Sequence, residues 1–304
     1  MSYKKNLLIF GSNGMLGQRL VYLAKHQGKY EILGTSYEKE NFNDGIEYIQ
    51  GDITNKEFIR DIIKTNKPDV IVNTAAYTNV DKAEEEKDLC WKVNALAVEN
   101  IAKYCKIFEN IHFIHISTDY VFDGKNGPYK ETDRVNPLGY YGKSKLAGEN
   151  AIIIADIPYT ILRTNVLYGP AKKGRPDFVK WVIEQLRNGN QIRIVDDQIN
   201  NPTYLDDLAL AALKSADMQK YGLFHIGGNE LLNRYEFTLK IAEFFELDKK
   251  LIIPIKTSEL NQKAKRPLKS GLVIDKAKQE LNYIPTSLID TFELMRVELK
   301  LWLC

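Results

Sequence analysis

The chain has 304 residues, a length that suits either two domains of ordinary size or one large α/β unit. Because 42 Lys and Arg stand against 40 Asp and Glu, the formal charge is only +2, and no global field attracts nucleic acid or an anionic membrane. With 44% hydrophobic and 27% charged residues, the composition excludes the disordered, collagen-like and disulfide-rich classes.

Short apolar runs alternate with longer amphipathic segments through the first half of the chain. Strands that alternate with helices are typical of a parallel sheet covered by helices on both faces. We therefore expect an α/β fold with a doubly wound parallel sheet. The runs that we predict as strands of this sheet are Asn6–Phe10, Tyr30–Leu33, Glu47–Ile49, Val70–Val72, Ile111–Ile116 and Tyr159–Leu162.

Local residue patterns indicate where the first helices begin and end. Gly28 follows the first amphipathic segment, as glycine does after many helices. The segment Thr54-Asn55-Lys56-Glu57 reads as a capping box that opens a helix ending near Pro68. Both patterns predict element boundaries and carry no information about function.

After about Arg163 the regular alternation fades. A loop rich in Gly, Pro and Lys covers 169–176, and the last part of the chain, 233–304, is predicted to be mostly helical. We predict a nucleotide-binding domain of residues 1–165 and 200–230 and a smaller substrate-binding domain of residues 166–199 and 231–304. The elements predicted between these landmarks are a helix over Asp177–Asn188, a strand over Ile192–Val195 and one more sheet strand over Leu223–Ile226.

Three glycines, Gly11, Gly14 and Gly17, follow the first predicted strand and open the first helix. Such glycines permit a tight turn, a close approach of backbone to a pyrophosphate and close helix packing, with the phosphates at the helix N-terminus. A plain turn without a ligand is the alternative. The GxxGxxG spacing points to the short-chain dehydrogenase variant of the dinucleotide fold.

The tip of the second strand is where an acid would bind a ribose 2′-hydroxyl and repel a 2′-phosphate. No acid stands clearly there, while Ser36 and Lys39 can accept a phosphate. We therefore expect NADPH as the cofactor, with Glu38 as the feature that keeps NADH open.

Tyr141 and Lys145 are four residues apart and share one face of a predicted helix. An adjacent ammonium favours an ionised phenol, so we expect Lys145 to lower the pKa of Tyr141 toward the working range of an acid/base catalyst. Thr118 ends the fifth strand, where ligands bind in open α/β sheets, and is placed to hydrogen-bond a substrate carbonyl oxygen. Alone, each pattern is more often structural; together they indicate a catalytic site.

Other candidate residues have a structural interpretation. His112 and His115 lie three apart in one strand and point to opposite faces, so they cannot share a metal ion. The acidic run Asp81–Asp88 complements a helix dipole. Three Cys without metal-ligand spacing suit a reducing compartment, and no apolar run reaches the roughly 20 residues that span a bilayer. We expect a cytoplasmic protein without a metal site or a membrane partner.

With these motifs in place, the sequence resembles an extended short-chain dehydrogenase/reductase, and specifically the dTDP-4-dehydrorhamnose reductase family. The resemblance covers essentially the whole chain and implies a Rossmann-type sheet with a smaller discontinuous cap. Its two central blocks are far more specific than the glycines. The blocks that carry it are Gly11–Gly17, Val72–Glu84, Ser117–Gly124, Tyr140–Glu149, Asn201–Thr203 and Arg266–Pro267.

The resemblance implies NADPH-dependent reduction of the C4 ketone of a nucleotide-linked 6-deoxy-4-keto sugar, with dTDP-4-dehydro-L-rhamnose as the expected substrate. It implies a catalytic set of Thr118, Tyr141 and Lys145. With Ser36 added from the strand tip, the expected cofactor contacts are Gly11, Asn13, Gly14, Met15, Leu16, Gly17, Ser36, Asp52, Ile53, Ala75, Ala76, Tyr77, Asn94, Tyr141 and Lys145. The expected substrate contacts are Thr118, Asp119, Tyr120, Val166 and Arg266.

One departure from the family concerns the sugar. Rhamnose reductases usually carry a Trp after the sixth strand, and this chain has Val166 at that place. Arg266 stands in a basic loop and can pair a diphosphate bidentately, although a solvated loop is the equal alternative.

Three other functions were weighed against ketoreduction. A dehydratase needs an acidic pair after the Thr, and Asp119 is followed by Tyr120. An epimerase would retain its NAD throughout, and a non-catalytic subunit like that of methionine adenosyltransferase also resembles this family. The intact catalytic set favours an enzyme. The sequence leaves a homodimer open.

Overall fold

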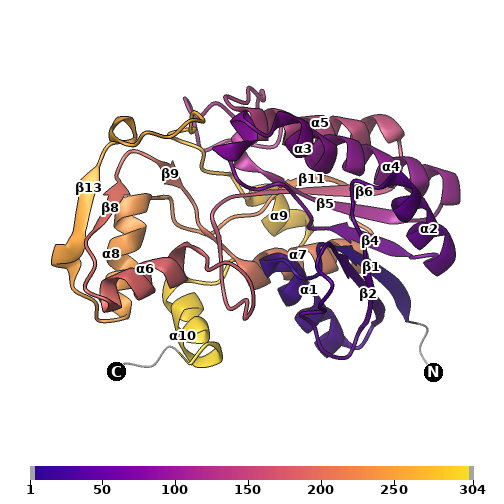
Figure 1. The fold of residues 1–304 in the computed structure, drawn as a ribbon, viewed down its shortest axis with the longest axis horizontal. Helices are drawn as coiled ribbons and strands as arrows, with labels where there is room; N and C mark the ends of the chain where they lie inside the picture. Colours follow the sequence, from indigo (N-terminus) through magenta and orange to yellow (C-terminus); the bar gives the residue numbers. More distant parts are fainter. Residues whose placement is uncertain (1–3, 301–304) are drawn as a thin grey trace.

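The computed structural model of the chain describes residues 4–300. Within this range a seven-stranded parallel sheet has the strand order β11-β6-β5-β4-β1-β2-β3 (Figure 1). The winding direction changes between β1 and β4, as in dinucleotide-binding folds. The expected doubly wound α/β fold is therefore confirmed. Its strands are β1 (Lys5–Phe10), β2 (Tyr30–Ser36), β3 (Glu47–Gln50), β4 (Val70–Asn73), β5 (His112–Thr118), β6 (Tyr159–Thr164) and β11 (Gly222–His225).

Several strands continue beyond the apolar runs that predicted them, at their carboxyl ends. β2 continues to Ser36, β4 to Asn73, β5 to Thr118 and β6 to Thr164, and all four of these side chains are buried. The parallel ladder extends through these polar residues, since it depends on backbone hydrogen bonds and not on apolar side chains. The polar ends of the strands lie together at the edge of the sheet where ligands bind.

Helices cover both faces of the sheet. The apolar cluster on one face unites α1, α7 and α9 with the strands, and the cluster on the other face unites α2, α4 and α5 (Figure 1). The helices, with short helical turns left aside, are α1 (Met15–Gln27), α2 (Lys56–Asn66), α3 (Lys87–Trp91), α4 (Ala97–Phe108), α5 (Tyr140–Ala155), α6 (Phe178–Arg187), α7 (Leu205–Asp217), α8 (Arg234–Phe244), α9 (Asp275–Glu280) and α10 (Leu288–Glu298).

The predicted helix boundaries are right at α1 and wrong by one residue at α2. Gly28 caps α1 in the left-handed region, with φ of 66°. The side chain that caps α2 is that of Asn55, which accepts from the Phe58 amide, and not that of Thr54. Thr54 instead donates from both its amide and its hydroxyl to Asp52. The predicted capping box therefore does not form, because Asp52 competes for Thr54.

A third apolar cluster lies away from the sheet and joins α6, α8 and α10 at the other end of the molecule (Figure 1). Here β8 (Ile192–Val195) pairs in parallel with β13 (Ile252–Ile255), a strand that the expectation of a mostly helical segment 233–304 did not include. Pro254 lies within β13, and because it interrupts the apolar run, the sequence did not indicate this strand. The predicted domain limits at 165, 199 and 230 stay predictions. The remaining short pairs are β7 (Leu167–Tyr168) with β10 (Thr203–Tyr204), and β9 (Ile199–Asn200) with β12 (Leu232–Asn233).

Residues 4–300 contain neither a membrane-spanning helix nor a cluster of metal ligands. None of the helices there has the length and apolar character needed to cross a membrane. No group of three or more His, Cys, Asp or Glu in that range is arranged to hold a metal ion. Cys90 and Cys105 are buried free thiols, and Cys304 lies outside the described residues.

Candidate active site

A cleft of about 1350 Å³ runs along the carboxyl edge of the sheet and reaches toward α6. Its volume exceeds the ~300–1,000 Å³ typical of a site for one small ligand, so it can take a dinucleotide together with a second ligand. The expected contact residues that line it are Gly11, Asn13, Gly14, Met15, Leu16, Ser36, Asp52, Ile53, Ala75, Ala76, Thr118, Asp119, Tyr120, Tyr141, Lys145 and Val166. Those that lie outside its lining are Gly17, Tyr77, Asn94 and Arg266.

The glycine turn between β1 and α1 leaves backbone exposed to this cleft. Gly11 has φ of 80°, and a Cβ there would lie 2.6 Å from the Ala75 amide nitrogen. Gly14 caps α1 without a side-chain hydrogen bond, so the first amides of the helix face the cleft. At Gly17 a Cβ would lie 2.2 Å from the Gly11 carbonyl oxygen. Gly17 therefore serves helix packing, while Gly11 and Gly14 shape a surface that suits a pyrophosphate.

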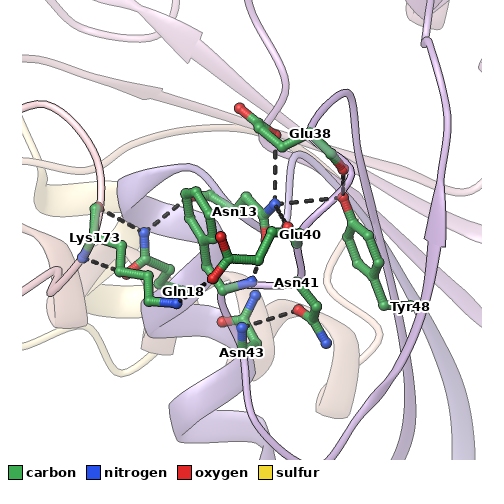
Figure 2. Close-up of polar contacts among 9 residues, drawn as sticks. Asn13, Gln18, Glu38, Glu40, Asn41, Asn43, Tyr48 and Lys173 are labelled. Carbon is green, nitrogen blue, oxygen red and sulfur yellow. Dashed lines mark hydrogen bonds and ion pairs between the residues drawn. The ribbon is translucent and has the colours of Figure 1, made fainter.

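Asn13 ties the turn to the loop after β2 (Figure 2). Its Nδ2 donates to the Glu40 carbonyl at 2.7 Å, a contact that Figure 2 shows. Its backbone amide donates to Ser36 Oγ at 3.0 Å, and its Oδ1 accepts from the Phe42 amide. Nδ2 also lies 3.4 Å from the Glu38 carboxylate, which lines the cleft. Asn13, which lies within the glycine turn, thus holds the tip of β2 in place.

The expected phosphate contact of Lys39 is not supported, because this exposed side chain lies outside the cleft lining. Two other cations line the cleft and were missed in the sequence, Lys173 and Arg175 of the 169–176 loop. Gln18 exchanges two hydrogen bonds with the Lys173 backbone, and Lys173 Nζ pairs with Glu40 at 2.9 Å (Figure 2). Arg175 has no ion-pair partner within residues 4–300, which leaves its charge available to a ligand.

Tyr141 and Lys145 lie on the first turns of α5 and are both part of the cleft wall. Burial raises the pKa of Tyr141, although a hydrogen bond with Thr118 opposes the shift. The expectation that Lys145 lowers this pKa is wrong. Lys145 Nζ instead donates to the Ile116 carbonyl at 2.6 Å and lies 3.2 Å from His115 Nε2. Tyr141 is therefore a protonated phenol, the form required of a proton donor.

Lys145 is itself perturbed. Burial lowers its pKa to about 8, against the opposing influence of Glu149. Glu149 is held in a buried ion pair with Arg163, with N–O distances of 2.9 and 2.6 Å, and also accepts from Ser117. This pair fixes α5 against β5 and β6, and so fixes the direction from which Lys145 reaches the cleft.

Thr118 and Asp119 also line the cleft. The Thr118 hydroxyl donates to Asp119 Oδ1 at 3.1 Å, and Ser270 donates to Asp119 Oδ2 at 2.5 Å. Burial raises the pKa of Asp119 to about 6. To orient a substrate oxygen, the Thr118 hydroxyl hydrogen has to turn from Asp119 toward that oxygen.

Arg234 is a further cation beside this part of the cleft, at the start of α8. Its guanidinium carbon lies 5.0 Å above the ring of Phe178, a residue of the cleft lining. Its charge acts on Asp119 and Tyr120, whose pKa values are nevertheless raised by burial. Within residues 4–300, Arg234 has no carboxylate at ion-pair distance. Nothing in its sequence surroundings indicated this position.

Arg266 is placed differently from the expectation. It pairs with Asp81 at 2.7 Å, donates to the Ala264 carbonyl and lies outside the cleft lining. The interpretation of the acidic run as a dipole complement is therefore wrong for Asp81. Glu84 does complement a helix dipole, but that of α5, because it accepts from the Tyr140 amide at the start of that helix. These acids hold the 263–266 loop and α5 in place.

Tyr77 and Asn94 act behind the cleft. Asn94 lies in a π-helical turn, Lys92–Leu96, accepts from the Tyr77 amide at 2.9 Å and donates to Ser144 on α5 at 3.1 Å. It joins the loop after β4 to α5. Val166 lines the cleft with φ of 40°, a strained value for a β-branched residue.

The model of the RmlD substrate binding domain family matches residues 5–295. A dTDP-4-dehydrorhamnose reductase from Aggregatibacter actinomycetemcomitans is 36% identical over 292 residues, which cover 92% of this chain and 94% of that protein. The chain belongs to the dTDP-4-dehydrorhamnose reductase family. The resemblance drawn from the motifs is confirmed.

Solved structures of the dTDP-4-dehydrorhamnose reductase family show the same fold. The enzyme of Bacillus anthracis, in complex with NADP, is 30% identical with a TM-score of 0.86, covering 97% of this chain and 99% of that one. The methionine adenosyltransferase 2 subunit beta of Danio rerio is 31% identical, over 88% of this chain and 82% of that protein. The relatives of this chain therefore include both a reductase and a subunit of methionine adenosyltransferase.

Proposed function

We propose that this chain is a ketoreductase that uses NADPH, with NADH as an alternative, to reduce the C4 ketone of a nucleotide-linked 6-deoxy-4-keto sugar. The substrate that the family favours is dTDP-4-dehydro-L-rhamnose, reduced to dTDP-L-rhamnose. The observation that carries the proposal is that Thr118, Tyr141 and Lys145 line one cleft together with the glycine turn. A reductase needs a proton donor and a dinucleotide site side by side.

The residues present fit a dinucleotide. The Gly11 position has no room for a Cβ, and the first amides of α1 are uncapped by side chains, so backbone can approach a pyrophosphate. Arg175 adds a cation to the cleft lining. Asp52, Ile53 and Ala75 would hold the adenosine half, and Lys145 the nicotinamide ribose. The bound cofactor would supply the hydride for C4.

The chain's own side chains handle the proton. Tyr141 is a neutral phenol because burial raises its pKa, so it can give its proton to the ketone oxygen as that oxygen becomes negative. Thr118 donates a hydrogen bond to the same oxygen once it turns from Asp119. When it is protonated, Lys145 stabilises the tyrosinate that remains. Arg234 lies outside the cleft lining but stacks on Phe178, which is part of it, and has no ion-pair partner within residues 4–300, so its guanidinium would bind the substrate diphosphate at this edge.

A regulatory subunit is the second candidate, favoured by the likeness to methionine adenosyltransferase 2 subunit beta. The presence of the complete catalytic set in the cleft favours the enzyme. A cytoplasmic location and a homodimer stay predictions.

The test is a panel of 4-keto sugar nucleotides, each with NADPH and with NADH, followed by the loss of reduced-nicotinamide absorbance. We expect turnover with a 6-deoxy-4-keto sugar linked to dTDP. No turnover on the whole panel, together with co-purification with an adenosyltransferase, would establish the regulatory function instead. An epimerase would show tightly bound NAD and no net oxidation.

A further inference from the structure

A buried row of polar side chains stands behind Lys145. Lys145 Nζ lies 3.2 Å from His115 Nε2, and His115 Nδ1 lies 3.3 Å from Asn73 Nδ2. Asn73 and His115 are register partners on β4 and β5, and neither side chain is exposed to solvent. Because water does not reach them, these groups must satisfy one another, and the direction of each hydrogen bond constrains the next.

The orientation of Asn73 is fixed by the backbone. The Ala75 amide, which is always a donor, lies 3.1 Å from Asn73 Oδ1. The acceptor end of the amide is therefore used, and its donor end, Nδ2, faces His115 Nδ1. For this contact to be a hydrogen bond, Nδ1 must carry no proton. His115 is neutral because burial lowers its pKa, so its single ring proton lies on Nε2.

This tautomer determines which kind of hydrogen-bonding group His115 presents to Lys145. An Nε2–H group is a donor, and it can bond only to an uncharged amine that offers a lone pair. A Lys145 amine can accept from His115 and donate to the Ile116 carbonyl at 2.6 Å, which satisfies every group. If Lys145 is an ammonium, its N–H groups face the Nε2–H group of His115, and neither can accept a hydrogen bond. The conflict is removed only if the ring proton moves to Nδ1, where it then faces the Nδ2–H₂ donor of Asn73.

We propose that Asn73 and His115 form a tautomer lock that shifts Lys145 toward its uncharged amine and so sets how readily this lysine gains and loses a proton. The proposal rests on the proposed function for its catalytic meaning. Ketone reduction consumes one proton per turnover, and Tyr141 must be reprotonated from solvent each time. A lysine that exchanges its proton near neutral pH serves that cycle better than one that is permanently charged.

Other groups act on Lys145 and do not account for this shift. On its own helix, α5, Tyr141 is neutral and Glu149 favours the ammonium; Cys90 of α3 also favours the ammonium. Arg163 of β6 is paired with Glu149 and moderates its effect. From β5, only His115 has a titratable side chain in hydrogen-bond contact with Lys145 among the described residues. Burial and the tautomer lock thus act together against the charged form.

The direct test is long-range proton–nitrogen NMR of the wild-type protein, which distinguishes the tautomers of its four histidines. We expect His115 to be protonated on Nε2 at neutral pH, with its signal assigned by its loss in His115→Phe. A protonated Nδ1 would overturn the proposal. This measurement needs no substrate, so it holds whether or not the reductase assay succeeds.

The second test reverses the lock with Asn73→Asp. A carboxylate can still accept from Ala75 and can also accept from Nδ1–H, which frees Nε2 to accept from the ammonium. We expect the ring proton to move to Nδ1, and the lysine titration, followed through carbon-13 at Cε, to move up by about one pH unit. The basic limb of kcat against pH should move equally.

His112→Gln is the matched control, since His112 is buried in the same strand and bonds Thr160 at 2.8 Å, away from Lys145. We expect no change in its lysine titration. If the pH midpoint of the Lys145 titration rises in Asn73→Asp while the ring proton stays on Nε2, the added negative charge alone explains the rise. That result would contradict the tautomer lock. If Asn73→Asp does not fold, the wild-type tautomer alone decides.

Discussion

The two ends of the cleft are built in different ways. At the cofactor end, seven consecutive residues, 11–17, form the turn, and their function depends on backbone amides and on the absence of side chains. At the substrate end, Asp119 bonds Ser270, 151 positions away in the sequence, and Arg234 comes from a third segment. A site formed by backbone amides uses consecutive residues, so it can be recognised in the sequence. A site formed by side chains from distant segments is assembled only when the chain folds.

The difference has a consequence for specificity. Every reductase of this type needs the same dinucleotide surface, and a few glycines provide it. The sugar and the nucleotide are contacted by side chains from separate segments, and each can change without disturbing the others. We therefore expect substitutions at the cofactor end to affect all substrates equally, and substitutions at the substrate end to separate one substrate from another.

The largest expected effect belongs to the group between the two ends. Tyr141→Phe removes the only proton that the proposal gives to the ketone oxygen, and kcat should fall by roughly 10²- to 10⁴-fold. The dissociation constant of NADPH should stay within about twofold, because the phenol hydroxyl is one contact among many. Stopped-flow turnover and fluorescence titration check the two values. Full turnover in a folded variant would refute the mechanism.

The next effect sharpens the contrast at the cofactor end. In Gly11→Ala the new Cβ meets the Ala75 amide nitrogen at 2.6 Å, so we expect NADPH to bind at least tenfold more weakly, roughly 1.4 kcal/mol. Gly28→Ala is the matched control, with a positive φ of 66° and nothing within 4 Å. It should cost only about 1 kcal/mol of stability, measured by urea unfolding, and leave binding unchanged. Equal loss of binding in both variants would show that backbone strain alone is responsible.

Arg234→Leu tests the substrate end. Loss of a charged hydrogen-bond donor should raise the KM for a dTDP-linked sugar by roughly tenfold or more, with little change in the KM for NADPH. Calorimetric titration with dTDP gives the same information without turnover. Arg193→Leu removes an exposed arginine that pairs with Glu259, and it should change neither constant. Unaltered dTDP affinity in Arg234→Leu would remove this residue from the substrate site.

The smallest effect concerns Asp119. Its folded-state pKa of about 6 lies above the ordinary value of 3.8, so the folded chain holds more protons than the unfolded chain between these limits. Stability should therefore decrease as pH rises from about 4 to 6. Asp119→Asn should lack this component, which a comparison of unfolding midpoints across that range measures. Parallel curves for the two proteins would contradict the assignment.

The α/β architecture and the glycine turn after β1 could both be predicted from the sequence alone. Alternation of strands and helices depends on local apolar periodicity, and the glycines and the Tyr141–Lys145 spacing act within one turn or one helix, so both could be recognised without the fold. The proposed catalytic set, Thr118, Tyr141 and Lys145, was named from the sequence partly through the family resemblance, and the structure brings these residues into one cleft. The strand ends were predicted too short, because residues such as Ser36 and Asn73 are polar for the sake of the site and not of the sheet.

Which cations are paired became visible only in the folded chain. Arg266 pairs with Asp81, Lys173 pairs with Glu40 and Lys145 contacts His115, whereas within residues 4–300 neither Arg175, in the cleft lining, nor Arg234, which stacks on Phe178, has an ion-pair partner. Desolvation likewise reversed the expected shift of Tyr141. Pairing and burial depend on residues that are distant in the chain and brought together by packing, so no local pattern in the sequence records them.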